Sequence, residues 1–303
     1  MAKKVLSIQS HVVHGYVGNK AATFPLQYRG WDVDALNTVQ FSNHPAYGHF
    51  RGFRSTAEEL REIIEEGLVK GLGIKYDAVL TGYLPDVAGL RTIAATVTKM
   101  CKNDPSTKWI LDPVLGDNGR LYVPEETIPI YKGILEQGEV FLATPNQFEM
   151  EILTCITIKD YDSLKRSINK FHELFPRVKY VVVTSVSIPE LHDHSFLSAC
   201  SDNKAKSAHY FQVEKIDAHF SGSGDLFSAL LVDTLLNDEN VTIDLPLALN
   251  KVLSLVDSIL QNTFNIVSNE TSKRPLKIND LKLIESRNLL RGEIKPRYKP
   301  IEL

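Results

Sequence analysis

The sequence is poor in cysteine and has no long apolar run. Its three cysteines among 303 residues, Cys101, Cys155 and Cys200, are widely spaced and form no Cys-x-x-Cys pair. This spacing argues against both a disulfide framework and a zinc site. No stretch approaches the roughly 18 uninterrupted apolar residues that span a bilayer. The apolar run after "MAKK" is also too short for a signal peptide. We therefore expect a soluble protein of the cytoplasm, with the nucleus left open as a second location.

The sequence also lacks a charge excess of either sign. Its formal net charge is −3, which gives no global electrostatic case for binding nucleic acid or an anionic membrane. Hydrophobic residues make up 43% of the chain and charged residues 23%, a mixture that can bury a sizeable core. No repeat, low-complexity tract or linker-like stretch divides it. We expect a single domain over residues 1–303.

Short β-branched runs alternate with amphipathic stretches along most of the chain. This alternation predicts an α/β fold with a mainly parallel central sheet and helices on both faces. Residues 195–213 depart from this alternation, and their pattern predicts an antiparallel hairpin. The expected strands are 4–9, 31–37, 76–83, 108–115, 139–146 and 179–186, and the expected helices are 18–30, 56–68, 85–102, 162–174, 225–237 and 246–262.

Two common phosphate-binding fingerprints are missing. After the first strand, Gly15 and Gly18 form a single pair instead of Gly-x-Gly-x-x-Gly, and no Gly-Lys-Ser/Thr ending of a Walker A motif occurs. The segment "SIQSHVVHGYVGNKAA" can be an ordinary long loop that enters a helix. Its functional interpretation places Ser10 at the end of the strand, facing a ligand, because ligands of open α/β sheets collect beyond the strand ends.

Four acids follow predicted strands or begin predicted helices: Asp112, Asp117, Glu149 and Asp225. The parallel-sheet interpretation places them on one edge, where four uncompensated charges would repel one another. Either some lie away from the site or a cation lies among them, and carboxylate oxygens suit Mg²⁺. Each also has a purely structural interpretation. Asp112 before Pro113 can form a turn, and Asn146 with Glu149 can be a helix N-cap and an acid that favours the helix dipole.

The stretch "HFSGSGDLFSALL" (219–231) supports two interpretations of one helix start. In the structural one, Ser221 or Ser223 is the N-cap, Asp225 favours the dipole, and apolar residues from Leu226 onward face the core. In the functional one, Gly222, Ser223 and Gly224 present backbone N–H groups to a phosphate at the positive end of the helix. Asp225 would then accept a proton from a hydroxyl nucleophile beside that phosphate.

Together these residues resemble a known family. "HFSGSGDLFSALL" is similar to the anion-hole motif of ribokinase-like kinases, and "TPNQFE" to their Asn-x-x-Glu magnesium motif. The blocks "LSIQSHVVHGYVGNKAATFPLQ", "NTVQFSNH", "VLTGYLPD" and "LDPVLGD" narrow the resemblance to the pyridoxal kinases. They occur in family order from residue 5 to about 230. The resemblance implies the three-layer α/β/α ribokinase-like fold and transfer of the ATP γ-phosphate to the 5′-hydroxymethyl group of pyridoxal, pyridoxine or pyridoxamine.

The resemblance also implies roles for particular positions. Asp225 would be the catalytic base, and the amides of Gly222–Gly224 would steady the transferring phosphoryl group. The substrate would also meet Ser10, His44, Tyr83 and the flap residue Tyr122. The nucleotide would lie against Asn146, Thr184, Ser185, Ser223 and Ile216, Asp217 and Ala218. Asp117 and Glu149 would lie near Mg²⁺, with Asp112, Thr144 and Thr184 around a monovalent cation, K⁺ or Na⁺. A homodimer is implied by the resemblance alone.

The sequence departs from the family pattern at two places. Pro45 stands where the family often has a substrate-contacting threonine, and it offers neither an N–H nor a hydroxyl. The flap "GDNGRLYVP" is compact. Two alternatives stay open: a hydroxymethylpyrimidine kinase-like enzyme, and a catalytically silent relative that binds ligands. A nicotinamide-dependent oxidoreductase would share the fold class but needs the missing glycine fingerprint.

Overall fold

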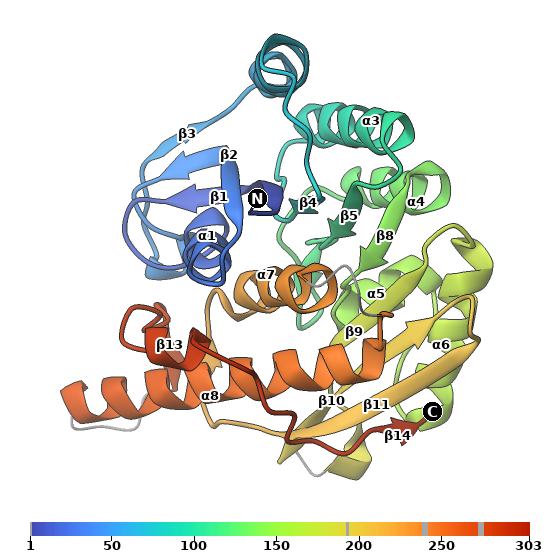
Figure 1. The fold of residues 1–303 in the computed structure, drawn as a ribbon. Helices are drawn as coiled ribbons and strands as arrows, with labels where there is room; N and C mark the ends of the chain where they lie inside the picture. Colours follow the sequence, from blue (N-terminus) through green and yellow to red (C-terminus); the bar gives the residue numbers. More distant parts are fainter. Residues whose placement is uncertain (1, 192–193, 238–241, 272–275) are drawn as a thin grey trace. The chain divides into compact units, whose positions relative to one another are not determined.

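The computed structural model describes residues 2–191, 194–237, 242–271 and 276–303 (Figure 1). Its contacts divide the chain into two compact units. The first combines Met1–Arg54 with Ile216–Tyr298, and the second combines Ser55–Lys215 with Lys299–Leu303. In the part of the chain that the structure describes, no helix combines the length and the apolar character that crossing a membrane requires.

The first unit begins with a parallel β-α-β arrangement. β1 (Lys4–Val12) pairs in parallel with β2 (Asp32–Phe41), and α1 (Asn19–Tyr28) connects them and packs on both strands. The short strand β3 (Gly52–Arg54) adds to β2 in the antiparallel direction. Val5, Leu6 and Ile8 of β1 are fully buried, as expected for a strand covered on both faces. The strands predicted at 4–9 and 31–37 and the helix predicted at 18–30 are confirmed.

Two long helices and a pair of short strands complete the first unit. α7 (Ser223–Leu236) packs against both α1 and α8 (Leu245–Thr271), and its apolar residues from Leu226 to Leu235 are buried. β12 (His219–Phe220) precedes α7 and pairs in parallel with β13 (Lys277–Ile278). The predicted helix at 225–237 is confirmed, and α8 extends past its predicted end at 262. The 3₁₀ turns of this unit are η1 (Pro45–Tyr47) and η4 (Arg287–Leu290).

The second unit holds four parallel strands followed by antiparallel ones. β4 (Ala78–Thr81), β5 (Lys108–Leu111), β8 (Val140–Ala143) and β9 (Tyr180–Val186) run in parallel. β10 (Ser195–Asp202) and β11 (Ser207–Glu214) form the predicted antiparallel hairpin, and β14 (Ile301–Glu302) pairs with β11. The other elements are α3 (Val87–Asn103), β6 (Gly116–Asp117), β7 (Arg120–Leu121), α4 (Thr127–Gln137), α5 (Gln147–Thr154), α6 (Tyr161–Leu174) and η3 (Pro189–Leu191).

Three of these parallel strands are shorter than the sequence pattern suggested. β4 covers residues 78–81 of the strand predicted at 76–83. β5 ends at Leu111 and β8 at Ala143, although the apolar runs predicted strands to 115 and 146. Pro113 and Pro145 follow the observed ends, and proline cannot donate a hydrogen bond to a ladder. The polar residues Asp112 and Thr144 therefore lie directly after the strands.

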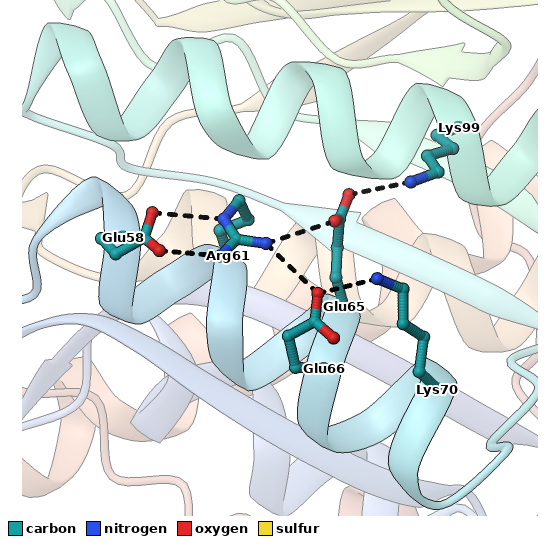
Figure 2. Close-up of polar contacts among 6 residues, drawn as sticks. All are labelled: Glu58, Arg61, Glu65, Glu66, Lys70 and Lys99. Carbon is teal, nitrogen blue, oxygen red and sulfur yellow. Dashed lines mark hydrogen bonds and ion pairs between the residues drawn. The ribbon is translucent and has the colours of Figure 1, made fainter.

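The helix predicted at 56–68 begins at a capping box. The side chain of Thr56 accepts a hydrogen bond from the Glu59 N–H, and the Glu59 carboxylate accepts one from the Thr56 N–H. α2 (Ala57–Arg61) then continues into the π-helical stretch η2 (Glu62–Gly71). Because π-helical spacing brings residues i and i+5 onto one side, Arg61 reaches Glu66 at 3.3 Å. Figure 2 shows the ion pairs that extend this contact, which join Glu58, Arg61, Glu65, Glu66, Lys70 and Lys99.

Candidate active site

The start of α7 has no side-chain cap. Its N-cap is Gly222, with φ 84°, and no side chain accepts a hydrogen bond there from the first amides of the helix. The prediction that Ser221 or Ser223 caps this helix is therefore wrong. The Ser223 hydroxyl lies 3.4 Å from the Phe220 carbonyl oxygen instead. First-turn N–H groups that no cap satisfies at the positive end of a helix can bind an anion.

Packing explains why glycine occupies position 222. A Cβ built there would overlap the carbonyl oxygen of Tyr16, and the left-handed φ is one that residues with a Cβ rarely adopt. Gly224, by contrast, would bring a Cβ into open space. The loop after β1 and the start of α7 are thus in direct backbone contact within the first unit.

Asp225 lies in the first turn of α7, and the same loop holds it. The N–H of Gly18 donates a hydrogen bond to its carboxylate. Gly18 in turn has φ 54° and packs so closely on Ser10 that a Cβ would overlap the Ser10 carbonyl oxygen. Burial raises the pKa of Asp225 to about 6, while the hydrogen bond from Gly18 opposes that rise. A carboxylate with a pKa near the physiological range is suited to accept a proton.

Ser10 lies inside β1, which continues to Val12, and not directly after the strand as predicted. The register of the β1–β2 ladder shifts between Gln9 and His11, so Ser10 falls at an irregularity of the ladder. Such irregularities re-aim side chains and are frequent beside active sites. Ser10, Gly18, Gly222 and Asp225 are therefore brought together, which joins the two sequence blocks that carry most of the family resemblance.

Asn19, which no sequence motif singled out, follows Gly18 and is fully buried. Its side-chain amide donates to the carbonyl oxygen of Leu36 at 2.9 Å and to Oδ1 of Asn37 at 2.8 Å. These bonds fix the first turn of α1 to β2. The only available signal was a polar residue at the start of an otherwise apolar helix.

His44, predicted near the substrate, has both ring nitrogens engaged within the protein. Nδ1 accepts a hydrogen bond from the Ala46 N–H at 3.3 Å, and Nε2 lies 3.1 Å from the carbonyl oxygen of Asn279. This pattern assigns the proton to Nε2. Burial lowers the pKa of His44, which favours the neutral ring. Pro45, the departure from the family pattern, is the first residue of η1, a position where a missing N–H costs nothing.

In the second unit, Glu149 is a fully buried carboxylate that organises two segments. Its Oε1 accepts the N–H of Leu115 at 2.9 Å, and its Oε2 accepts the N–H of Asn146 at 2.9 Å. Asn146 completes a capping box at the start of α5 and donates its side-chain amide to the Gly116 carbonyl oxygen at 2.8 Å. Burial and the charge of Asp112 raise the pKa of Glu149. The structural interpretation of Asn146 and Glu149 as cap residues is therefore confirmed.

The flap predicted at "GDNGRLYVP" is a β-hairpin. β6 and β7 are joined by Asn118 and Gly119, both with positive φ, as a two-residue hairpin turn requires. The Asp117 carboxylate accepts from both the backbone and the side-chain N–H groups of Asn118. Tyr122 follows β7 and is 53% exposed. Burial of part of its side chain, with the charges of Asp117 and Glu149, raises the pKa of Tyr122.

The predicted cation and nucleotide residues of the second unit lie at the ends of its parallel strands. Thr144 follows β8 and is buried, and Thr184 near the end of β9 forms a bridge with Asn146. Ser185 is exposed with φ 55°, and Tyr83 follows β4. Among the residues that the structure describes, no three His, Cys, Asp or Glu side chains gather closely enough to hold a metal by themselves.

The strip Ile216-Asp217-Ala218 begins the second segment of the first unit and leads into β12. The Ala218 N–H donates to the Ile216 carbonyl oxygen at 2.7 Å, which turns the chain tightly before the strand. The sequence-predicted residues are thus distributed over both units. Ser10, His44, Ile216–Ala218 and the Gly222–Asp225 start of α7 belong to the first, and the others belong to the second.

Known proteins resemble this chain over almost its whole length. A family model described as phosphomethylpyrimidine kinase matches residues 53–271. The chain is 53% identical over 299 residues to BUD17 of Saccharomyces cerevisiae, covering 97% of this chain and 94% of that protein. It is 35% identical over 300 residues to human pyridoxal kinase, covering 94% of each. A solved pyridoxal kinase of Leishmania donovani, in complex with ADP and pyridoxine, is 33% identical and has a TM-score of 0.84 over 99% of both chains.

The chain has the fold of the ribokinase-like small-molecule kinases. Within that class, the chain belongs to the pyridoxal kinase family of ATP-dependent kinases. The family resemblance and the mainly parallel α/β fold predicted from the sequence are confirmed.

Proposed function

We propose that this protein transfers the γ-phosphate of ATP to the 5′-hydroxymethyl group of pyridoxal, pyridoxine or pyridoxamine, with Asp225 as the base. The observation that carries the proposal is the Asp225 carboxylate, held by the Gly18 N–H, beside the uncapped start of α7. The solved relative from Leishmania donovani, in complex with ADP and pyridoxine, supports the nature of both substrates.

The chemical step needs a base, an oriented acceptor and stabilisation of phosphate charge. Asp225 takes the proton of the 5′-hydroxyl group as that oxygen attacks the γ-phosphorus. The bond between the γ-phosphorus and the β–γ bridging oxygen breaks, and ADP leaves. The amides of Gly222, Ser223 and Gly224 bind the transferring phosphoryl group. Ser10 would hydrogen-bond the polar edge of the pyridine ring, with His44, Tyr83 and Tyr122 around the substrate.

The nucleotide, on this proposal, lies against Asn146, Thr184, Ser185, Ser223 and the strip Ile216–Ala218. The cap at Asn146 and its bridge to Thr184 hold two of these residues side by side. We propose that both units act as one kinase domain, since the residues assigned to acceptor and nucleotide come from both.

The donor set suits hard cations. Glu149 and Asp117 would serve Mg²⁺, and Asp112, Thr144 and Thr184 would surround K⁺ or Na⁺. Asp112 lies close enough to the buried Glu149 to raise its pKa, so a nearby cation would relieve their repulsion. When bound, Mg²⁺ neutralises charge on the phosphates. Both Glu149 oxygens already accept backbone N–H groups, so this carboxylate also acts by fixing the loop at 115–116.

The proposals on assembly and location rest on the family resemblance alone. We propose a homodimer in the cytoplasm, with the nucleus as a second location.

If Asp225 is the base, activity should fall at low pH, which gives the pH profile an acid limb. Asp225 accepts a proton only when it is ionised, so activity is present above its pKa and lost as pH falls through it. With a pKa raised to about 6, kcat/KM for pyridoxal should decline about tenfold per pH unit below that value. Initial rates at low substrate across the pH range that brackets 6 measure the limb. A flat profile through this range would contradict the assignment of Asp225.

Glu149→Gln tests the buried carboxylate. An amide has one acceptor oxygen, so one backbone N–H would face an NH₂ group, at a cost of about 2 kcal/mol in the free energy of unfolding. The lost charge should also raise the magnesium concentration needed for half-maximal turnover. Glu151→Gln is the matched control, because Glu151 lies on the same helix and accepts a backbone N–H from Ile158. A magnesium titration that moves equally in both variants would argue against a role of Glu149 toward the metal.

A substrate panel tests the proposed function as a whole. The purified protein is incubated with magnesium-ATP and each of pyridoxal, pyridoxine, pyridoxamine and hydroxymethylpyrimidine. We expect phosphorylation of at least one B6 vitamer in preference to the pyrimidine. The family model's description as phosphomethylpyrimidine kinase makes preference for the pyrimidine the outcome that would replace this proposal. No product with any of them would favour a silent ligand-binding relative.

A further inference from the structure

Residues 277–280, far from the predicted site in sequence, lie against the segment that leads into α7. β13 pairs in parallel with β12, with Lys277 opposite His219 and Ile278 opposite Phe220. The ladder continues one step further, because the Ser221 N–H donates to the Ile278 carbonyl oxygen at 3.1 Å. Ser221 directly precedes Gly222. The 277–280 segment therefore supports the backbone that positions the start of α7 and Asp225.

The same segment holds the η1 turn through three hydrogen bonds. The Asn279 carbonyl oxygen accepts from His44 Nε2 at 3.1 Å, and the Lys277 ammonium group donates to the Ala46 carbonyl oxygen at 2.9 Å. The Tyr47 hydroxyl donates to the Asp280 carboxylate. Burial together with Asp280 raises the pKa of Tyr47 to about 12. The hydroxyl therefore stays protonated and remains a donor at neutral pH.

Asp280 also reaches the loop after β1. Its Oδ2 lies 3.7 Å from His14 Nε2. Its Oδ1 packs on Gly15, where φ is 97° and a Cβ would overlap that oxygen. Within the described residues Oδ1 is buried and accepts no hydrogen bond. A buried carboxylate oxygen without a hydrogen-bond donor lowers the free energy of unfolding. Stability alone therefore does not explain why Asp280 occupies this position.

One carboxylate thus connects the η1 turn with the loop after β1, while its own segment supports the entry to α7. All of these contacts lie within the first unit. We propose that Asp280 is a positioning residue that fixes the η1 turn and the His14–Gly15 loop relative to Asp225. It thereby determines the affinity for the pyridine substrate. This inference rests on the proposed function, in which Ser10 and His44 lie beside that substrate.

Kinetics of two variants test the inference. Asp280→Ala and Tyr47→Phe each remove the hydrogen bond between these residues, and each should raise KM for pyridoxal about tenfold, the effect of one charge-assisted bond. KM for ATP and the acid limb assigned to Asp225 should not move. Because the two variants remove the same interaction, the double variant should lose less than the product of the single effects. Lys282→Ala is the matched control, since Lys282 lies two residues away and pairs with Glu270 at the surface.

Hydrogen exchange without substrates gives a readout that does not depend on activity. The amides of residues 46–48 should exchange faster in Asp280→Ala and Tyr47→Phe than in the wild-type protein, and no faster in Lys282→Ala. Exchange rates equal to those of the wild type in both variants would overturn the inference, even if the protein phosphorylated no vitamer and the proposed function failed. With an active wild-type enzyme, an unchanged KM for pyridoxal in Tyr47→Phe and Asp280→Ala would also overturn it.

Discussion

Asp225→Asn is expected to lower turnover of pyridoxal by about 10²–10⁴-fold, the usual cost of losing a general base. The asparagine keeps the size of the side chain and can still accept the hydrogen bond from the Gly18 N–H. It cannot take the proton of the attacking hydroxyl group. Because the amides at the start of α7 stay in place, binding of ATP should largely survive. Steady-state kinetics together with a direct ATP-binding titration measure the two effects separately.

Asp244→Asn is a suitable control for this substitution. Asp244 is exposed and accepts the Leu247 N–H at 2.9 Å at the start of α8, so the exchange also replaces an acid at a helix start with an amide. Asparagine is an equally good cap, and turnover should not change. Near-normal turnover in Asp225→Asn would remove the assignment of Asp225 as the base, whatever the control showed.

Gly222→Ala is expected to cost both stability and turnover. A Cβ would overlap the Tyr16 carbonyl oxygen, and alanine at φ 84° is itself strained. The left-handed conformation and the forced repacking together should lower the free energy of unfolding by about 2–5 kcal/mol. Relief of the overlap must move the loop after β1 or the start of α7, and displacement of about 1 Å at a reacting centre costs roughly 10²-fold in rate. Denaturant unfolding and turnover of the same preparation measure both.

Gly292→Ala separates backbone strain from overlap. Gly292 has the same φ of 84°, but a Cβ there meets no atom within 4 Å. This variant should lose only the cost of the left-handed conformation, about 1–2 kcal/mol, and keep full turnover. If Gly222→Ala behaved like Gly292→Ala, the close contact between Gly222 and the loop after β1 would have no part in catalysis.

Local patterns were enough to predict most helices and strands. The alternation of apolar runs and the hairpin at 195–213 both depend on neighbours in sequence, and both predictions are confirmed. α4 was missed because Pro129 and Gly133 weaken its helical pattern. Proline is nevertheless tolerated in the first turn, where its missing N–H has no partner to lose.

The sequence predicted which side chains form the site, but it did not predict the backbone contacts that position them. Asp225 and Glu149 carry a residue signature, but the N–H of Gly18 that holds Asp225 carries none. The N-cap was misplaced because Ser221 and Ser223 are both good caps by local preference. The contact of Gly222 with the Tyr16 carbonyl oxygen, which decides the conformation, comes from a distant part of the chain. The 277–280 segment combines a two-residue strand and the Asn279 carbonyl oxygen with the single side chains of Lys277 and Asp280, so no sequence pattern pointed to it.

The most direct test of the central claim is the formation of pyridoxal 5′-phosphate from pyridoxal and magnesium-ATP by the wild-type protein and by Asp225→Asn, measured in parallel. We expect steady product formation by the wild type and a rate about 10²–10⁴-fold lower in the variant. Equal rates in the two proteins, or no product from the wild type, would contradict it.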